Sequence, residues 1–236
     1  IVQLLPINDT TMTHSWEDSY PYNANSTFAL HPQFVNLKAA GVRACPTYKR
    51  VQKELNSLEQ IDYERVNAEK RKFLRRSFDK NFETLSATEE YKTFLKQNKE
   101  WLIPYATFCA LRDEFKTPDF SKWGKYAKYD KRKVSQYYKD NSSEVDFNCF
   151  IQYHLDKQLS EVCKYAHSKG VVLKGDLPIG ISRTSVDAWI YPELFHMDSQ
   201  AGAPPDAFSE DGQNWGFPTY NWEKMAEDDF AWWKAR

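Results

Sequence analysis

The sequence predicts an α/β fold in which a long helical region separates two parallel strands. Three observations support this prediction. The chain begins with an apolar run, IVQLLPIN, that is typical of a buried strand. A second apolar run, VVLKGDLPI, directly follows an amphipathic helix and a glycine, which is the order of elements in a parallel α/β unit. Between the two runs, residues 41 to 146 have the apolar spacing of helices rather than of strands.

The first predicted strand covers residues 1 to 8 and is ended by a proline and a turn-forming asparagine. The segment that follows, up to Pro32, is rich in turn formers and aromatic residues, which predicts a loop. This loop contains the aromatic stretch DSYPYN, from Asp18 to Asn23. Considered alone, DSYPYN is more typical of an exposed turn than of a binding site.

The helical region begins near Val51 with a face made of Val51, Leu55, Leu58, Asp62 and Val66, which is continued or restarted by Phe73, Leu74, Phe78 and Phe82. Residues 87 to 115 predict two more helices. Pro104 should separate them, and Ser86 is the predicted cap of the first.

The stretch from Ser142 to Gly170 predicts an amphipathic helix. Its buried stripe should consist of Phe147, Phe150, Ile151, Leu155, Leu159, Val162, Cys163 and Ala166. Gly170 occupies the position at which a glycine commonly ends a helix. The second strand follows at once and ends at Gly175 and Asp176, and the final segment, WEKMAEDDFAWWKAR, predicts a helix.

These elements divide the chain into three parts. Residues 1–40 hold a strand and an aromatic loop, residues 41–146 form a helical insertion, and residues 147–236 hold a helix, a strand and a second aromatic loop. A βα unit takes roughly 30 residues, so at most about four units fit outside the insertion. A closed eight-stranded barrel is thereby excluded, whereas a part of one that carries a large helical insertion is compatible with the length.

Composition narrows the classes of partner. Lys and Arg number 32 and Asp and Glu number 33, so no overall field attracts nucleic acid or an acidic membrane. The run from Lys122 to Lys139 is basic and rich in tyrosine, as in some single-strand binders, but a solvated face is the favoured interpretation. There is no membrane-length apolar run and no spacing typical of a metal or nucleotide site, so we expect neither a membrane nor a cofactor.

The cysteines and the first residues bear on location and extent. The four cysteines are widely spread, which indicates reduced thiols and a cytoplasmic protein. The first residues lack the charged start of a signal peptide. The chain also opens on an apolar run without an initiator Met, so we expect it to be a part of something larger.

Two regions contain side chains suited to catalysis or ligand binding. Asp176 ends a predicted buried parallel strand, where barrel enzymes place working groups, although a capping role is an equal alternative. The loop GAPPDAFSEDGQNWGFPTYNW, from Gly202 to Trp222, presents aromatic and amide groups suited to sugar rings and hydroxyls, namely Phe208, Gln213, Trp215 and Tyr220. Its alternative is an Ω-loop packed on its own aromatics. The carboxylates Asp176, Asp187, Asp198, Asp206, Glu210 and Asp211 show no convincing catalytic pair.

Several stretches together resemble a known family. In chain order they are VQLLPIND, DSYPYNANSTFALHP, IDYERV, EWLIPYATFCAL, KGDLPIG, SVDAWIYPELF and GAPPDAFSEDGQNWGFPTYNW. They resemble the 4-α-glucanotransferases called amylomaltases or disproportionating enzymes, and the resemblance covers essentially the whole chain. The GDLPI strand followed by the PPD-F-S--GQ-WG-P loop is its most specific part. SYPYNANSTFALHP and QNWGFPTYNWEKM are most similar to the variant that uses maltose and heteroglycans.

The resemblance implies a fold and a reaction. The fold would be the (β/α)8 TIM barrel of the α-amylase superfamily, of which this chain would hold about strands two and three and a large helical insertion. The reaction would be retaining transfer of α-1,4-glucan segments or glucose between maltooligosaccharides, by double displacement on an aspartate with a glutamate as acid. No cofactor is implied, and the partner would be a maltooligosaccharide or α-glucan.

The resemblance also assigns residues. Asp176 matches the family's aspartate that binds the donor sugar, and Tyr22 matches a tyrosine that stacks near the same sugar. Phe208, Gln213 and Trp215 match the acceptor-side loop. Three departures from the family pattern matter, and two of them lie beside these residues. The sequence after Asp176 is LPIGIS, without the histidine of amylases, which favours a glucanotransferase, and Ala207 replaces an aromatic neighbour of Phe208.

The catalytic carboxylates are the largest departure. The nucleophile motif G-F-R-x-D-H and the acid motif A-E-D-L do not occur, and AEDD, from Ala226 to Asp229, lies in a Trp-rich helical segment without a preceding strand. We therefore expect no catalytic residue in this chain and no turnover by the chain alone. The first alternative is a non-catalytic glycan-binding module, and a nucleic-acid adaptor that uses the basic run is a distant third. The sequence leaves the oligomeric state open.

Overall fold

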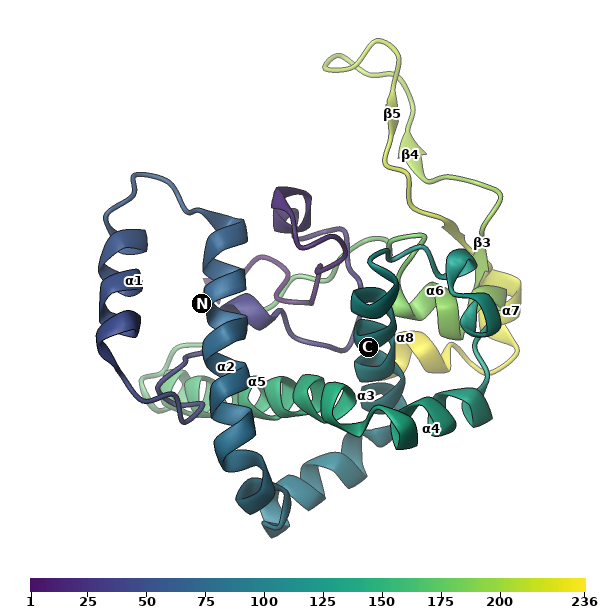
Figure 1. The fold of residues 1–236 in the computed structure, drawn as a ribbon. Helices are drawn as coiled ribbons and strands as arrows, with labels where there is room; N and C mark the ends of the chain where they lie inside the picture. The colour runs from purple at the N-terminus through teal and green to yellow at the C-terminus, as the bar shows by residue number, and fades with distance from the viewer.

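A computed structural model describes residues 1–236 (Figure 1). Three long helices form its frame: α2 (Tyr63–Ser86), α3 (Glu89–Phe115) and α5 (Ser142–Ser168). Two shorter ones, α1 (Pro46–Asn56) and α4 (Lys131–Asp140), flank this frame. Short 3₁₀ turns connect the elements: η1 (Trp16–Ser19), η2 (Pro32–Phe34), η3 (Phe120–Lys122), η4 (Gly124–Tyr126) and η5 (Pro192–Leu194). None of the helices combines the length and the apolar character needed to span a membrane.

Two aromatic cores hold the helices together. In the first, α3 and α5 enclose Phe108, which lies 4.8 Å from Trp123 and 5.7 Å from Trp189 between ring centroids. In the second, α2 packs on α5, and Phe78 lies 5.5 Å from Phe147 in an edge-to-face arrangement. Such aromatic pairs contribute about 0.5–1.5 kcal/mol each beyond the apolar area that they bury.

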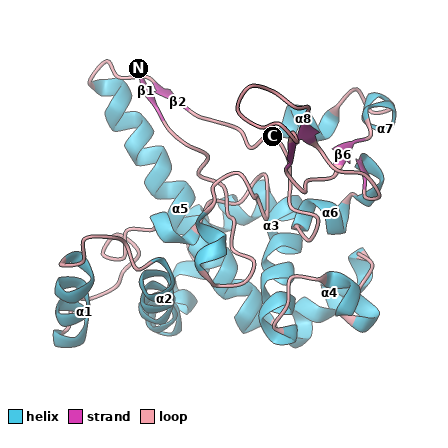
Figure 2. Cartoon of the chain, turned by 90° about the horizontal axis from the view of Figure 1, so that it is seen from above, coloured by secondary structure: helices cyan, strands magenta, loops and turns pink.

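The buried stripe predicted for α5 is correct only in its first half. Phe147, Phe150, Ile151 and Leu155 are buried, whereas the side chain of Val162 is 55% exposed and Leu159, Cys163 and Ala166 are half-buried. The difference arises because α2 and α3 pack on the first half of α5 and leave the second half uncovered. Figure 2 shows this second half extending away from the other helices towards the N-terminus.

Helix α5 ends as predicted. Gly170 has a φ of +69°, and its N–H donates to the carbonyl of His167 at 2.9 Å. The N–H of Val171 donates to the carbonyl of Ala166 at 2.9 Å, which completes a Schellman motif. The boundary expected between residues 146 and 147 falls inside this helix, because α5 begins at Ser142.

Two sequence-based helix boundaries were wrong. Pro104 does not separate two helices, since α3 continues through it to Phe115. The cap of α3 is Thr88, whose hydroxyl accepts from the N–H of Tyr91, whereas Ser86 is the last residue of α2. Burial explains the first error: the residues around Pro104 lie in the α3–α5 core, so packing outweighs the lost backbone hydrogen bond.

The two predicted strands do pair, and the pairing is parallel. β1 (Val2–Gln3) lies beside β2 (Leu173–Lys174), with Val2 opposite Leu173. The prediction that the first strand is buried was wrong, because Ile1 is 90% exposed and Val2 47% exposed. The pair forms a two-stranded sheet with no third strand, and both residues of β1 are exposed. Figure 2 shows it at the far end of α5.

The last part of the chain forms a smaller unit against α3. Helices α6 (Val186–Ile190), α7 (Trp222–Ala226) and α8 (Ala231–Ala235) enclose a third core that includes Ile181, Leu194 and Met225. β3 (Phe195–His196) pairs antiparallel with β6 (Thr219–Tyr220). Between them, β4 (Gly202–Ala203) and β5 (Gln213–Asn214) form a hairpin that projects far from the body of the molecule (Figure 1).

Candidate functional site

The structure brings together two of the predicted site residues. The hydroxyl of Tyr22 donates to Oδ2 of Asp176 at 2.9 Å. The hydrogen bond to this carboxylate, together with desolvation, raises the pKa of Tyr22, so the phenol keeps its proton at neutral pH. Asp176 lies just after β2 and is half-buried. Its Oδ1 makes no protein hydrogen bond, so this oxygen is available to a ligand hydroxyl.

A buried carboxylate that no sequence pattern indicates as a site residue anchors the loop that carries Tyr22. Asp9 is 1% exposed and accepts from the Thr11 N–H at 2.9 Å, from Asn25 Nδ2 at 3.2 Å and from the Tyr105 hydroxyl at 2.8 Å. Tyr105 belongs to α3, so this contact ties both limbs of the loop to the helical frame. Burial of a charged group requires such partners, and Asp9 is therefore a structural residue.

A chain of three polar groups anchors the segment directly before the tyrosines. Nδ1 of His31 accepts from the Gln33 N–H at 3.0 Å, so its proton lies on Nε2, 2.6 Å from the Tyr63 hydroxyl. Tyr63 in turn donates to the carbonyl of Asp18 at 2.9 Å. Burial lowers the pKa of His31, which keeps the ring neutral and preserves this direction of donation.

The other end of the loop is held by Asp187, one of the carboxylates considered for catalysis. Asp187 is 2% exposed and accepts from Thr27 through its N–H at 2.9 Å and its hydroxyl at 3.0 Å, and from Trp232 Nε1 at 3.1 Å. Burial raises its pKa. Because all its contacts lie inside the protein, Asp187 links α6 and α8 to the loop and does not face a ligand.

The remaining predicted residues lie on the projecting hairpin. The side chain of Phe208 is 95% exposed at the tip, and that of Trp215 is 40% exposed. Oε1 of Gln213 accepts from Trp215 Nε1 at 3.0 Å, which fixes the indole beside the amide. Phe208 and Trp215 do not pack on each other, so the hairpin is not an Ω-loop closed on its own aromatics. It also makes no contact with the Tyr22–Asp176 pair.

The hairpin is ordered by its own backbone. At the tip, Oδ1 of Asp206 accepts from the N–H groups of Phe208 and Ser209, both at 2.8 Å. In the stem, Gly202 lies so close to Gln213 that a Cβ there would come within 2.0 Å of the Gln213 carbonyl oxygen. Tyr220 lies below the hairpin, where its hydroxyl donates to the carbonyl of Ile179 at 2.7 Å, so it belongs to the base.

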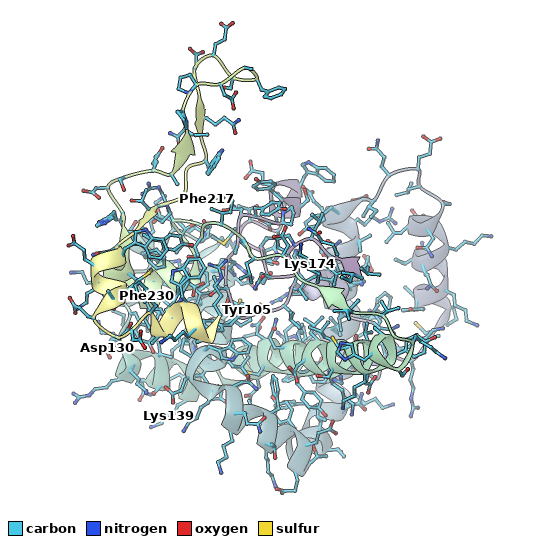
Figure 3. The ribbon with its side chains drawn as sticks, turned by 180° about the vertical axis from the view of Figure 1, so that it is seen from behind. Tyr105, Asp130, Lys139, Lys174, Phe217 and Phe230 are labelled. Atoms are coloured by element: carbon cyan, nitrogen blue, oxygen red, sulfur yellow. The ribbon has the colours of Figure 1, made fainter.

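The basic, tyrosine-rich run is not an aromatic platform. Tyr137 is 3% exposed and lies 5.4 Å from Tyr126 between ring centroids. Tyr129 lies 5.1 Å from Trp189. These rings pack against the first core, whereas the Lys and Arg side chains of the run lie mostly in solvent together with Asp130 and Gln136, as expected of a solvated face. Figure 3 shows Asp130, which precedes α4, and Lys139, near the end of α4, away from the hairpin.

Acidic residues of the last segment have structural roles. Oδ1 of Asp228 accepts from the N–H of Ala231 at the start of α8. Glu227 forms an exposed ion pair with Lys224. AEDD spans the end of α7 and the turn that follows it. The single helix predicted for the final segment is wrong at this point, because Asp229 and Phe230 both have a φ of +57° and separate α7 from α8. No group of three His, Cys, Asp or Glu side chains lies close enough to hold a metal ion.

Comparison with known proteins gives a consistent result. The 4-alpha-glucanotransferase family matches residues 1–236. The "4-alpha-glucanotransferase DPE2" of Oryza sativa subsp. japonica is 46% identical over 243 residues, which cover 100% of this chain and 26% of that protein. The 4-alpha-glucanotransferase of Chlamydia caviae is 36% identical over 241 residues, covering 100% of this chain and 44% of the relative. The chain thus spans less than half the length of these relatives.

Solved structures agree with this match. The amylomaltase from Streptococcus agalactiae, solved in complex with acarbose, superimposes with a TM-score of 0.83 at 30% identity. The superposition covers 98% of this chain and 48% of that one. The amylomaltase from Corynebacterium glutamicum superimposes with a TM-score of 0.71 over 98% of this chain and 33% of its own. At 20% identity, the second likeness concerns the fold alone.

Proposed function

Because the chain belongs to the 4-alpha-glucanotransferase family, we propose that it forms the glucan-binding part of such an enzyme. In this proposal Tyr22 and Asp176 bind the donor sugar, and Phe208, Gln213 and Trp215 bind the acceptor. The hydrogen bond between Tyr22 and Asp176 carries the proposal, because it joins two residues that were matched to the same sugar from separate parts of the sequence.

The donor side rests on the geometry of Asp176. Its Oδ2 is held by Tyr22, and its Oδ1 is left for a sugar hydroxyl. A charged acceptor makes hydrogen bonds roughly twice as strong as those of neutral groups. The ring of Tyr20, 5.7 Å from that of Tyr22, extends the aromatic surface on which the apolar face of a pyranose would rest.

The acceptor side rests on the hairpin. Phe208 and Trp215 present exposed aromatic rings on which the apolar face of a sugar could stack. The indole N–H of Trp215 is occupied by Gln213, so the amide nitrogen of Gln213 stays available to a glucan hydroxyl. In this proposal the hairpin presents these side chains to an incoming glucan chain.

The proposed architecture is a part of a (β/α)8 barrel. β1 and β2 would be about its second and third strands, with residues 41–146 as an insertion and the aromatic loops in residues 1–40 and 147–236 beside the mouth. The parallel pairing of β1 and β2 supports this, as does the apolar surface that the pair leaves uncovered.

The chemistry proposed for the whole enzyme is retaining transfer without a cofactor. An aspartate would form a glycosyl intermediate, a glutamate would protonate the leaving oxygen, and an acceptor hydroxyl would replace water. Neither motif for these two carboxylates occurs in the 236 residues. We therefore assign binding to this chain and the two catalytic carboxylates to segments outside it.

The test replaces Asp176 by Asn in the full-length enzyme and measures glucose transfer from maltotriose. We expect kcat/KM to fall by at least about a hundredfold, because the sugar loses a charged partner in the transition state. Asp198→Asn is the control, since Asp198 is an exposed carboxylate nearby in sequence. Equal activity of the two variants would refute the role of Asp176.

A non-catalytic glycan-binding module is the second candidate, favoured by the exposed Phe208 and Trp215. The two candidates differ in turnover. If the full-length protein binds maltooligosaccharides but transfers no glucose, the module is correct and the transferase is wrong.

A further inference from the structure

The side chain of Arg183 joins the two limbs at the foot of the hairpin. Its Nε donates to the carbonyl of Gly216 at 2.9 Å, and its Nη1 donates to that of Met197 at 2.5 Å. Its Nη2 donates to the carbonyl of Ser199. Gly216 follows β5, whereas Met197 and Ser199 precede β4, so one guanidinium bridges both limbs.

The hairpin has few other connections to the body of the molecule. The Ala201 N–H donates to the Phe217 carbonyl at 2.8 Å, and the Trp215 N–H donates to the Ala201 carbonyl at 3.0 Å, but both bonds run from one limb to the other. Figure 3 shows Phe217 at the foot and the hairpin extending freely above it. An isolated two-stranded hairpin is marginally stable at best in water, so the direction of this hairpin is decided at its foot, where it joins the body of the molecule.

We propose that Arg183 is a positioning residue that sets the direction of the hairpin and thereby the affinity for the acceptor glucan. The proposal rests on the proposed function, in which Trp215 binds the acceptor. Arg183 itself touches no sugar. It acts through Gly216, the residue next to Trp215, and it holds this residue against the opposite limb.

The residue type fits this role. Arginine presents its N–H donors in a flat, rigid fork that stays charged at every accessible pH, so it bonds three carbonyl groups at once. Lysine has a single ammonium on a flexible stem and cannot span the same three oxygens. All three contacts of Arg183 are to backbone carbonyls rather than to a carboxylate. The contact therefore constrains the path of the backbone.

Loss of Arg183 should affect binding of the acceptor and not binding of the donor. A shift of about 1 Å in a binding group is enough to weaken recognition strongly. Loss of Arg183 should therefore raise the KM for the acceptor and leave the KM for the donor, which depends on Tyr22 and Asp176, near its original value. A residue that merely stabilised the fold would lower the melting temperature and the amount of active enzyme without separating the two constants.

The experiment uses Arg183→Gln and Arg183→Lys in the full-length enzyme. Transfer from a saturating donor to a labelled glucose or maltose acceptor gives the acceptor KM, and the reverse titration gives the donor KM. Hydrogen exchange of the Ala201 and Trp215 amides reports the hairpin directly. Arg75→Gln is the matched control, because Arg75 is a half-buried arginine that bonds Glu144 and the Ser143 carbonyl far from the hairpin. Trp215→Ala tests the underlying function.

We expect Arg183→Gln to raise the acceptor KM about tenfold, which corresponds to about 1.4 kcal/mol, with faster exchange at Ala201 and Trp215. Arg183→Lys should lie between this variant and the wild type. In a Trp215→Ala background, Arg183→Gln should add little, because both changes remove the same contact.

Two results would overturn the inference, and they are distinguishable. If Trp215→Ala weakens acceptor binding but Arg183→Gln behaves like Arg75→Gln, the hairpin binds the acceptor without needing Arg183. If Trp215→Ala leaves the acceptor KM unchanged, the proposed acceptor role of the hairpin is wrong, and the inference falls with it.

Discussion

The hydroxyl of Tyr22 lies 2.9 Å from a carboxylate oxygen of Asp176, although 154 positions separate the two residues in the chain. This contact connects the loop after β1 to the end of β2, and the parallel pairing of the two strands makes it possible. Because neighbouring parallel strands end at the same edge of a sheet, residues just beyond them meet there.

Removal of the Tyr22 hydroxyl should weaken donor binding. In Tyr22→Phe the Oδ2 of Asp176 loses its donor and is free to rotate away from the sugar. We expect the donor KM to rise at least about tenfold, which is close to the lower end of the range for a hydrogen bond to a charged group, while the acceptor KM changes little. Tyr20→Phe is the matched control, since Tyr20 is a neighbouring, 55% exposed ring. Equal effects of the two variants would contradict the prediction.

Widening the stem of the hairpin should abolish its order without unfolding the protein. A side chain at Gly202 would collide with the Gln213 backbone, so Gly202→Val should separate β4 from β5. We expect fast hydrogen exchange between residues 201 and 216 and a loss of acceptor affinity. Ala203→Val adds bulk where a Cβ already exists and should leave the exchange slow. Protected hairpin amides in Gly202→Val would argue against this geometry.

The two halves of α5 should differ in their contribution to stability. Phe147 is fully buried in the second core and lies under the guanidinium of Arg75 at 3.7 Å. Phe147→Ala should therefore lower the free energy of unfolding by about 3–5 kcal/mol. Val162 is 55% exposed, so Val162→Ala should cost less than about 0.5 kcal/mol. Urea denaturation of the chain measures both values, and similar losses would show that the second half is packed as well.

Local sequence patterns predicted where helices and strands lie better than they predicted which of their side chains other elements cover. The end of α5 at Gly170 and the strand after it follow from residues next to one another, and both are confirmed. The exposure of β1 and of Val162 was not predictable, because apolar side chains do not reveal whether another element covers them. Pro104 remained inside α3 because the tertiary core overrides a local helix breaker.

In the candidate site, too, the sequence predicted some residues and not others. The family resemblance matched Tyr22 and Asp176, and the structure brings them into contact. The sequence did not predict the groups that support this pair. Asp9 accepts a hydrogen bond from Tyr105, 96 residues away, and Asp187 accepts one from Trp232, 45 residues away. Arg183 likewise serves carbonyl groups up to 33 residues away. Such contacts leave no periodic signal, because polar residues in loops are common and their partners are set by the tertiary fold.

Stability should fall as the pH decreases from about 6.5 towards 4, in part through His154. The ring lies 4.4 Å from Phe150 and 5.2 Å from Tyr153, and burial, aided by Lys157, lowers the pKa of His154 to about 4. In the unfolded chain the pKa is about 6.5, so between these values the unfolded state takes up a proton that the folded state does not. The free energy of unfolding therefore keeps its full value above pH 6.5. As the pH falls from about 6.5 towards 4, it decreases by up to about 1.4 kcal/mol per pH unit through this group.

The variant His154→Gln should reduce this loss, measured as the difference in melting temperature between pH 7.5 and pH 4.5. An unchanged pH dependence in the variant would mean that His154 titrates alike in both states.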